Sequence, residues 1–256
     1  MLPFLNNAMW MSHLYAQPLN APLFYGPFAT DPELYTPDVL NGFDSWMGVG
    51  QLLITPTLFE GMLQREVYFP KAGDDDAALY FDLHLPCKTY RAGSRGTVST
   101  PLDHFGIFAR EGAVMPIGKP AVTVTARSGP PIVHGDGVEA VLKGDGGVVE
   151  LDDWRGVQLF PAQEGSYRGS WIEDDGISVD PAKCVIEVDY RATPTSVTVS
   201  FKVLEDAFSP LWGWHLDVIL PVGDARKVIQ ASKREGEKAA TETQWQGRPC
   251  WRVTIQ

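Results

Sequence analysis

The first sixteen residues have the hydrophobic spacing of a helix with a wide apolar face. Two apolar rows run along this segment; they are Phe4, Ala8, Met11 and Tyr15, and Leu2, Leu5 and Met9. Pro18 ends the helix, and the next run, "PLNAPLFY", is typical of a short buried strand. Because the helix has no packing partner within its own segment, we expect its apolar face to be exposed and to promote self-association.

From about residue 40 the hydrophobic period changes to two, which predicts strands. "REVYFP" alternates Val67 and Phe69 with Glu66 and Tyr68, and "GKPAVTVTARSGPP" alternates valine with threonine between Gly and Pro. Further strands are predicted in "TPLDHFGIFAREGAVMP", "CVIEVDY", "SVTVSFKVL", "HLDVILPV" and "CWRVTIQ".

Strands at this density, separated by turn residues, favour antiparallel sandwiches over βαβ units. We therefore predict a mostly β fold, in which two antiparallel β-sandwich domains follow an N-terminal helix and strand. The boundary between the sandwiches is placed near residues 118–121. The 25 glycines and 20 prolines recur between short apolar runs, as the turns of such a fold require.

The formal net charge of −11 makes nucleic acid and anionic membrane surfaces poor partners, because like charges repel. A neutral ligand such as a sugar remains compatible. The start of the chain has no basic region, and Pro3, Asn6 and Asn7 interrupt its apolar run, so it is a weak signal-peptide candidate. No apolar run approaches the ~20 residues that span a bilayer, and the sequence leaves the compartment open.

Cysteine and histidine spacing indicates no disulfide framework, metal site or catalytic triad. Cys87, Cys184 and Cys250 are odd in number and widely spaced, so we expect three buried thiols. The histidines show no HExxH spacing, and the neighbours Asp103 and His104 leave an extended chain on opposite faces. Two G-x-G tripeptides, "GVG" and "GDG", lack the third glycine of a dinucleotide site and are expected to be turns. We predict no metal and no cofactor.

Three acidic runs are candidates for the carboxylate pair of a glycosidase; they are Asp74-Asp75-Asp76, Asp152-Asp153 and Glu173-Asp174-Asp175. In "SWIEDDGIS", Glu173 and Asp175 would lie roughly 6–7 Å apart on a strand, which glycoside hydrolysis allows. Both would project the same way from one segment, however, and Asp175-Gly176 is typical of a type I′ hairpin turn. We therefore predict a solvated turn, with a calcium or sugar contact as the alternative, and assign no catalytic residue.

The tryptophans suggest a second possible function, carbohydrate binding by a β-sandwich. The rings that could form its sugar platform are Trp154, Trp171, Trp212, Trp214 and Trp245. Tryptophans of a β-rich chain are more often buried, so we expect most of these rings in the core.

Four ordered blocks within residues 2–180 follow a known pattern. They are "LPFLNNAMWMSHLYAQPLNAPLFYGPFATDPE", "MGVGQLLITPTLFEGMLQREVYFPK", "TPLDHFGIFAREGAVMP" and "YRGSWIEDDGISVD". The blocks resemble glycoside hydrolase family 31, the α-glucosidase and α-xylosidase family. The first resembles the end of its catalytic (β/α)8 barrel, a helix of the type L-P-Y-L-Y and a strand of the type P-L-F. The others are similar to its segments G-x-x-L-L-V-A-P-V with R-E-V-Y-L-P, P-L-D-x-I-P-V-F-x-R-x-G-x-I-I-P, and the Y-E-D-D-G turn of its distal β-domain.

The resemblance implies three parts: the end of the catalytic barrel (about 1–40), a proximal C-terminal β-sandwich (about 41–120) and a distal one (about 121–256). The parent chemistry would be retaining hydrolysis of a terminal α-linked glucose or xylose through a covalent glycosyl-aspartate. In the family, the nucleophile lies in a W-x-D-M-N-E-type motif and the acid/base aspartate in a later barrel loop, both N-terminal to this helix. Neither motif occurs here, so no residue inherits a catalytic role and we expect the isolated chain to be inactive.

The function that the resemblance implies is that of the C-terminal part of such a hydrolase, whose β-domains brace the barrel. Carbohydrate would be bound through the parent barrel. The chain itself would contact the missing barrel portion, or a second copy through its N-terminal helix. The alternatives are a free-standing carbohydrate-binding module and a non-catalytic structural remnant.

Overall fold

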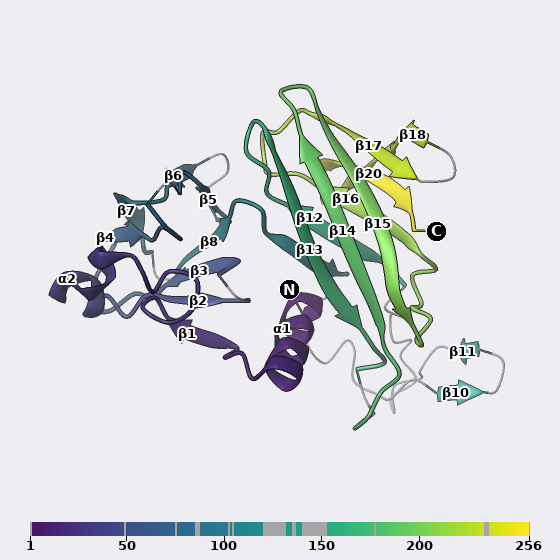
Figure 1. The fold of residues 1–256 in the computed structure, drawn as a ribbon, viewed down its shortest axis with the longest axis horizontal. Helices are drawn as coiled ribbons and strands as arrows, with labels where there is room; N and C mark the ends of the chain where they lie inside the picture. Colours follow the sequence, from purple (N-terminus) through teal and green to yellow (C-terminus); the bar gives the residue numbers. More distant parts are fainter. Residues whose placement is uncertain are drawn as a thin grey trace.

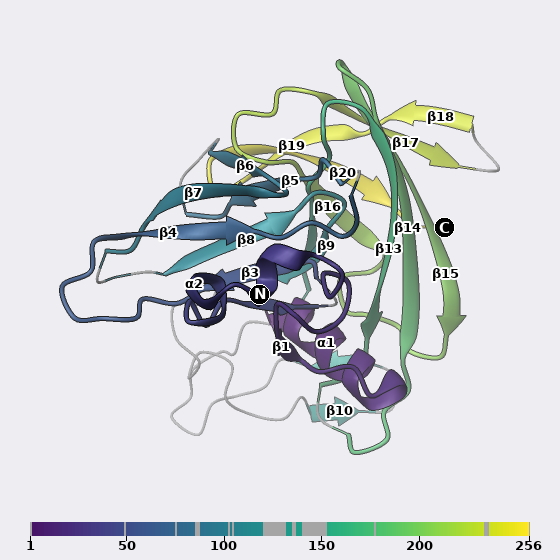
Figure 2. The same ribbon diagram turned by 60° about the vertical axis from the view of Figure 1, so that its left-hand side comes forward.

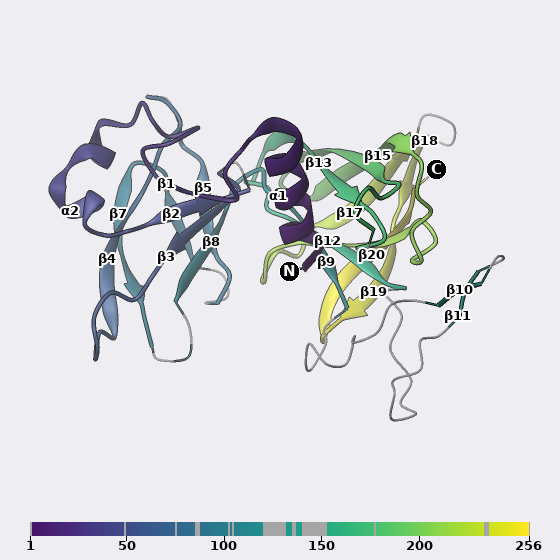
Figure 3. The ribbon, with the colours of Figure 1, turned by 90° about the horizontal axis from the view of Figure 1, so that it is seen from below.

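A computed structural model describes residues 2–48, 50–74, 76–84, 88–101, 103, 105–119, 132–134, 137–139, 153–176, 178–232 and 236–255. Within them the protein consists of two assemblies of β-sheet, with helix α1 (Leu2–Tyr15) lying between them (Figures 1 and 3). The prediction of a mostly β fold is confirmed. In this part of the chain the strands do not close into a barrel, and no helix is long and apolar enough to cross a membrane.

The first assembly combines a six-stranded sheet with a two-stranded one (Figure 1). The larger sheet has the order β1 (Asn20–Pro22), β2 (Ser45–Met47), β3 (Leu52–Thr55), β8 (Gly106–Arg110), β5 (Leu79–Asp82) and β6 (Thr89–Arg91), all antiparallel. The smaller sheet pairs β4 (Gln64–Phe69) with β7 (Ser94–Ser99). The short helices η1 (Pro32–Tyr35) and α2 (Pro37–Leu40) connect β1 to β2.

The core of this assembly confirms the alternation in "REVYFP", since Val67 and Phe69 are both buried. Tyr68 was expected on the polar face and is buried as well. Its hydroxyl donates to Asp31 Oδ2 at 2.7 Å, which satisfies the polar end of the ring.

The second assembly packs two five-stranded sheets face to face. One has the order β19 (Thr241–Trp245), β20 (Arg248–Thr254), β16 (His215–Ile219), β12 (Arg155–Leu159) and β9 (Val114–Gly118). The other has the order β13 (Gly165–Glu173), β14 (Cys184–Ala192), β15 (Ser196–Asp206), β17 (Lys227–Ser232) and β18 (Gly236–Ala239). A separate hairpin joins β10 (Ile132–His134) to β11 (Gly137–Glu139). The predicted strands "CVIEVDY", "SVTVSFKVL", "HLDVILPV" and "CWRVTIQ" all contribute to this sandwich (Figure 2).

Two strand pairs of the sandwich depart from the predicted antiparallel pattern, because β12 pairs with β16 and β15 with β17 in parallel. In each case the chain crosses to the opposite sheet between the two strands. A strand that returns after such a crossing can run in the same direction as its new neighbour.

Strand β9 pairs with β12, so the chain enters the second assembly before the boundary expected near residues 118–121. Most of "GKPAVTVTARSGPP" lies outside the described residues. The division at residues 40 and 120 stays a proposal. It concerns which parts of the chain fold independently, and strand pairing does not test independent folding.

Helix α1 begins and ends close to the predicted limits, but the expectation of an exposed apolar face holds on one side only. It packs against β9 and β13 of the second assembly. Phe4 and Ala8 are buried, and Phe4 belongs to a core cluster that joins Met115 of β9 to Leu52 and Ala109 of the first assembly. Apolar side chains remain exposed on the other side, among them Leu2 and Met9. The partner could not be found locally, because β13 follows the helix by about 150 residues.

Candidate functional site

The acidic run at residues 173–175 places its three carboxylates in three different environments. Glu173 ends strand β13, and its side chain is only 6% exposed. Arg155 of the facing sheet donates to both carboxylate oxygens, each at 2.8 Å. Trp171 Nε1 also donates to Glu173 Oε1 at 2.8 Å. The predicted solvated turn is therefore wrong for Glu173, which forms a buried ion pair between the two sheets.

Asp174 connects the same strand end to helix α1. Its carboxylate accepts hydrogen bonds from Trp10 Nε1 and, at 3.3 Å, from Asn6 Nδ2. The next residue of the helix, buried Asn7, accepts from Ile172 N and donates to Ser170 O. Because β13 is an edge strand, Asn7 uses its amide to satisfy backbone groups that no neighbouring strand could reach.

Asp175 lies in the solvated part of the run. It is exposed and accepts a hydrogen bond from Ser178 N at 2.9 Å. Gly176 has a φ of +66°, in the left-handed region that favours glycine. The predicted two-residue hairpin is nevertheless wrong, because residues 174–183 all lie between β13 and β14.

We expect Gly176→Val to lower the free energy of unfolding by about 1–3 kcal/mol, since a β-branched residue is strained at positive φ. No atom lies within 4 Å of a Cβ added at Gly176, so backbone strain rather than a clash would cause the loss. Urea denaturation followed by tryptophan fluorescence measures it. The control Gly176→Asn should lose less stability, because asparagine tolerates this conformation. If both variants are as stable as the original protein, residue 176 does not require a positive φ.

The other acidic runs form no glycosidase pair among the described residues. Asp76 accepts from Ala72 N, Ala78 N and Arg110. Burial acts to raise the pKa of Asp76, but these hydrogen bonds outweigh it and hold the pKa below its usual value, whereas a catalytic acid needs a raised one. Asp153 pairs with Lys119 at 2.5 Å. Asp75 and Asp152 lie outside the described residues.

Asp44, which the sequence did not single out, is a carboxyl whose pKa burial raises, to about 7. Both of its oxygens accept from Arg65 Nη2 at 2.7 Å. Arg65 Nη1 also donates to the carbonyls of Gly42 and Pro56. Asp44 and Arg65 thus fix the two loops on either side of β2 and β3, a structural role rather than an acid/base one.

The tryptophans do not form an exposed sugar platform. Trp171 and Trp212 are buried in the sandwich core. Trp154 and Trp245 stack on each other with ring centroids 6.1 Å apart and nearly parallel planes, and Trp214 packs edge-on against Trp212. All eight tryptophans are buried or half-buried, which agrees with the expectation of core rings.

The remaining candidates contribute no site in the part of the chain that the structure describes. No cluster of histidine, cysteine and carboxylate side chains could hold a metal ion there. Cys184 and Cys250 are buried free thiols, as expected, and burial raises the pKa of each. Cys87, His104 and most of the "GDG" tripeptide lie outside the described residues.

Exposed apolar side chains concentrate near the N-terminus. Among the residues that the structure describes, twelve of the seventeen exposed large apolar residues lie within residues 2–63. This N-terminal apolar surface consists of Leu2, Met9, Leu14, Tyr15, Leu19, Phe24, Tyr25, Tyr35, Leu40, Phe43, Phe59 and Leu63. Exposed apolar residues at this density mark an interaction surface more often than a freely solvated one.

Phe43 is the most constrained member of this surface. It has a φ of +53°, which is uncommon for a bulky residue, and is 72% exposed. Its neighbours Gly42 and Asp44 are both held by Arg65, so the backbone on each side of the ring is fixed. Strain that surrounding contacts maintain is typical of residues with a binding role.

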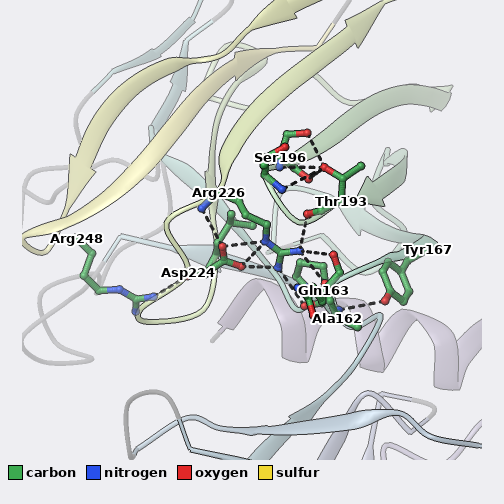
Figure 4. A network of polar contacts seen from close by, with 11 residues as sticks. Ala162, Gln163, Tyr167, Thr193, Ser196, Asp224, Arg226 and Arg248 are labelled. Atoms are coloured by element: carbon green, nitrogen blue, oxygen red, sulfur yellow. Dashed lines mark hydrogen bonds and ion pairs between the residues drawn. The ribbon is translucent and has the colours of Figure 1, made fainter.

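Arg226 links three loops at one end of the second assembly, as Figure 4 shows. Its guanidinium binds Asp224 and donates to the carbonyls of Pro161, Ala162, Gln163 and Thr193. Each of its three nitrogens is already engaged within the protein. Arg226 therefore stabilises these loops and offers no donor to a ligand.

Comparison with known proteins finds the chain similar to parts of several glycosidases. No family model matches it. It is 29% identical over 126 residues to intestinal sucrase-isomaltase of Oryctolagus cuniculus, a match that covers 49% of this chain and 6% of that protein. It is 28% identical over 124 residues to an uncharacterized family 31 glucosidase of Schizosaccharomyces pombe, covering 48% of this chain and 12% of that protein.

Among solved structures, the chain resembles a GH31 dextranase of Flavobacterium johnsoniae complexed with glucose, with a TM-score of 0.65 and 14% identity. The match covers 98% of this chain and 29% of the dextranase, and at this identity it concerns the fold. The curated relatives are members of family 31, and the chain spans only 6–15% of their length. The chain is thus related in sequence and in fold to part of the family 31 glycosidases.

Proposed function

We propose that this chain is the C-terminal, β-rich part of a retaining α-glycosidase, and that its sheets brace the catalytic (β/α)8 barrel. The observation that carries this proposal is the N-terminal apolar surface. Nine of its twelve residues lie within residues 1–40, the segment that resembles the end of that barrel, and the structure leaves them exposed. A barrel packed against it would remove this apolar area from water.

Helix α1 suits such a bracing role because its two sides differ. One side is held on the second assembly by Asn7 and the bonds of Asp174, and Phe4 on this side packs against both assemblies. The other side presents Leu2 and Met9 to solvent, 64% and 61% exposed. The β-sandwich would therefore hold a barrel helix in place before the rest of the barrel packs on it.

In this proposal the barrel supplies all of the chemistry, the hydrolysis of a terminal α-linked glucose or xylose. The two carboxylates of retaining hydrolysis must flank the scissile bond about 5–5.5 Å apart. Glu173 and Asp174 are instead committed to Arg155 and to helix α1. A carbohydrate-binding module is less well supported, since none of the five tryptophans considered for its platform is exposed.

Co-expression tests the proposal. The chain is produced with the reading frame of its own genome that encodes the W-x-D-M-N-E-type motif, and only the barrel carries an affinity tag. We expect the chain to co-purify with the barrel and the complex to hydrolyse p-nitrophenyl α-glucoside or α-xyloside.

A matched pair of variants locates the contact. Phe43→Asp introduces a charge into the N-terminal apolar surface and should release the chain from the tagged barrel. Val179→Asp introduces the same charge at an exposed residue outside that surface and should not. A barrel that is fully active without this chain and does not retain it contradicts the bracing role.

A further inference from the structure

A cleft opens where the two β-assemblies meet at the start of helix α1. Its volume is about 960 Å³, which lies in the range of sites that bind small molecules. Strands β5, β9 and β12, residues 220–224 and the turn between β19 and β20 all contribute to its wall. Among the described residues the cleft shares only Leu2 with the N-terminal apolar surface, so the two are different places.

The floor of the cleft is apolar. Phe81 of the first assembly and Phe160 of the second contact each other there, with ring centroids 5.6 Å apart. Met115, Ile117 and Leu220 continue the surface. A ligand that covers this floor with hydrocarbon is favoured, because apolar area of both partners leaves water.

One polar side chain, that of Gln158, lies in the middle of this floor. Its neighbours on β12, Val157 and Leu159, are buried in the sandwich core, so Gln158 lies on the opposite face of the sheet, which lines the cleft. In the register of the sheet it is flanked by Met115 of β9 and Ile219 of β16. The cleft therefore has one amide, a donor and an acceptor together, set among apolar side chains.

The Gln158 amide is half-buried, and in the part of the chain that the structure describes it has no hydrogen-bond partner. Two other half-buried glutamines are bonded to backbone atoms. Gln51 accepts from Val114 N at 3.0 Å, and Gln230 donates to Thr254 O and accepts from Thr254 N. Since a polar group that is partly removed from water is less stable without a partner, a ligand that bonds Gln158 gains free energy.

The charged side chains of the described lining are engaged within the protein. They are Asp82, Lys88, Lys119, Asp224, Arg226 and Arg248. Lys119 pairs with Asp153, and Arg226 pairs with Asp224 (Figure 4). Arg248 donates to Leu220 O at 2.8 Å, and Asp82 accepts from His84 N at 2.8 Å.

The ammonium of Lys88 lies away from the floor. Its Nζ donates to Thr97 O at 3.1 Å and lies 4.9 Å from the ring of Tyr90. Tyr90 and Phe81 are on opposite faces of the β5–β6 ribbon, because Phe81 pairs with Thr89, the residue before Tyr90. A charged ligand would therefore lose its hydration without gaining a new counter-charge from the described lining, and the cleft favours an uncharged one.

We infer that this cleft binds an uncharged molecule with an apolar body and one hydroxyl group. The body covers the apolar floor, and the hydroxyl donates to the amide oxygen of Gln158 and accepts from its amide nitrogen. A sugar fits less well, because most of its hydroxyls would face hydrocarbon without a partner. This inference does not depend on the proposed bracing role, since the cleft and the N-terminal apolar surface are different places.

The test uses the full chain and 2-naphthol, an aromatic alcohol that is uncharged near neutral pH and whose fluorescence changes when it leaves water. We expect saturable binding that shifts the NMR signal of the Gln158 side-chain amide and leaves that of Gln244, an exposed residue outside the lining, unchanged. Two compounds with the same rings, 2-naphthoate with its charge and 2-methylnaphthalene without a hydroxyl, should each compete about fivefold less well or worse.

Three results would overturn the inference. They are the absence of saturable binding, a Gln158 signal that does not move, and competition by either compound as strong as that of 2-naphthol itself. A shift of the Gln158 signal by glucose at lower concentrations than by 2-naphthol would also overturn it, because the cleft would then select a sugar.

Matched variants separate the hydroxyl contact from the apolar floor. Gln158→Leu keeps the size of the side chain and removes the amide, so it should weaken 2-naphthol binding about fivefold and remove the preference over 2-methylnaphthalene. Thr89→Trp places an indole beside Phe81 and should weaken the binding of both compounds. The controls Gln244→Leu and Thr97→Trp make the same changes at exposed residues outside the lining and should alter neither affinity. If Gln158→Leu and Gln244→Leu, both folded by circular dichroism, bind 2-naphthol equally well, the assignment of Gln158 is overturned.

Discussion

Replacing Glu173 with alanine is expected to lower the free energy of unfolding by about 3–5 kcal/mol, among the largest single losses in this chain. Glu173 is the buried partner of Arg155, and its removal takes away the carboxylate that two guanidinium nitrogens bind between the two sheets. The indole N–H of Trp171 loses its acceptor in the same step. Urea denaturation followed by circular dichroism measures the loss.

Two controls show whether the loss of stability comes from breaking the ion pair or from removing any acidic residue of the run. Asp175→Asn, in the solvated part of the same loop, should stay within about 0.5 kcal/mol of the original protein. The double replacement Glu173→Leu with Arg155→Leu should recover much of the loss, because apolar side chains of similar volume often replace a buried ion pair without penalty. A single Glu173→Ala variant of unchanged stability would contradict the buried pair.

Deleting residues 1–16 is expected to destabilise the second assembly instead of releasing a monomer from aggregates. The deletion uncovers β9 and β13 and removes Phe4, which is only 1% exposed. Loss of a buried phenylalanine side chain alone costs about 3–5 kcal/mol. The backbone groups of Ile172 and Ser170 also lose the amide of Asn7, at about 1–3 kcal/mol.

Point variants on the two sides of helix α1 test the same idea in the full chain. Phe4→Ala should lower the free energy of unfolding by about 3–5 kcal/mol. Met9→Ala, on the exposed side of the same helix, should change it by no more than about 0.5 kcal/mol. If the truncated chain keeps its full stability and becomes more monomeric, the helix is not integral to the fold.

The strands of the fold could be predicted from the sequence because their signal is local. Val197 and Val199 alternate with polar residues, and both are buried in the sandwich core. The helix at residues 2–15 follows from its own spacing as well. The parallel pairing of β12 with β16 could not be found this way, because it depends on crossings between the two sheets.

The environment of the acidic run could not be predicted, because every decisive contact is distant in sequence. Glu173 resembles a turn residue until Arg155 of the facing sheet is placed against it. Asp174 is separated from Trp10 by 164 positions. Nothing in the sequence near Asn6 and Asn7 accounts for two polar residues in an apolar helix. In the structure Asn7 binds the backbone of the edge strand β13, and Asn6 binds Asp174 just after that strand.

The cleft of about 960 Å³ where the two assemblies meet could not be predicted from the sequence either. Its lining comes from at least five separate elements, none of which carries a recognisable binding motif.

Turnover by the purified chain alone tests the central claim most directly. The account predicts no hydrolysis of p-nitrophenyl α-glucoside or α-xyloside above the background of a mock purification, because the described carboxylates of the acidic runs are engaged in structural contacts or exposed on a loop. Activity that survives repurification and is abolished in a folded variant such as Asp175→Asn would contradict it. That result would show that this chain carries a catalytic centre of its own.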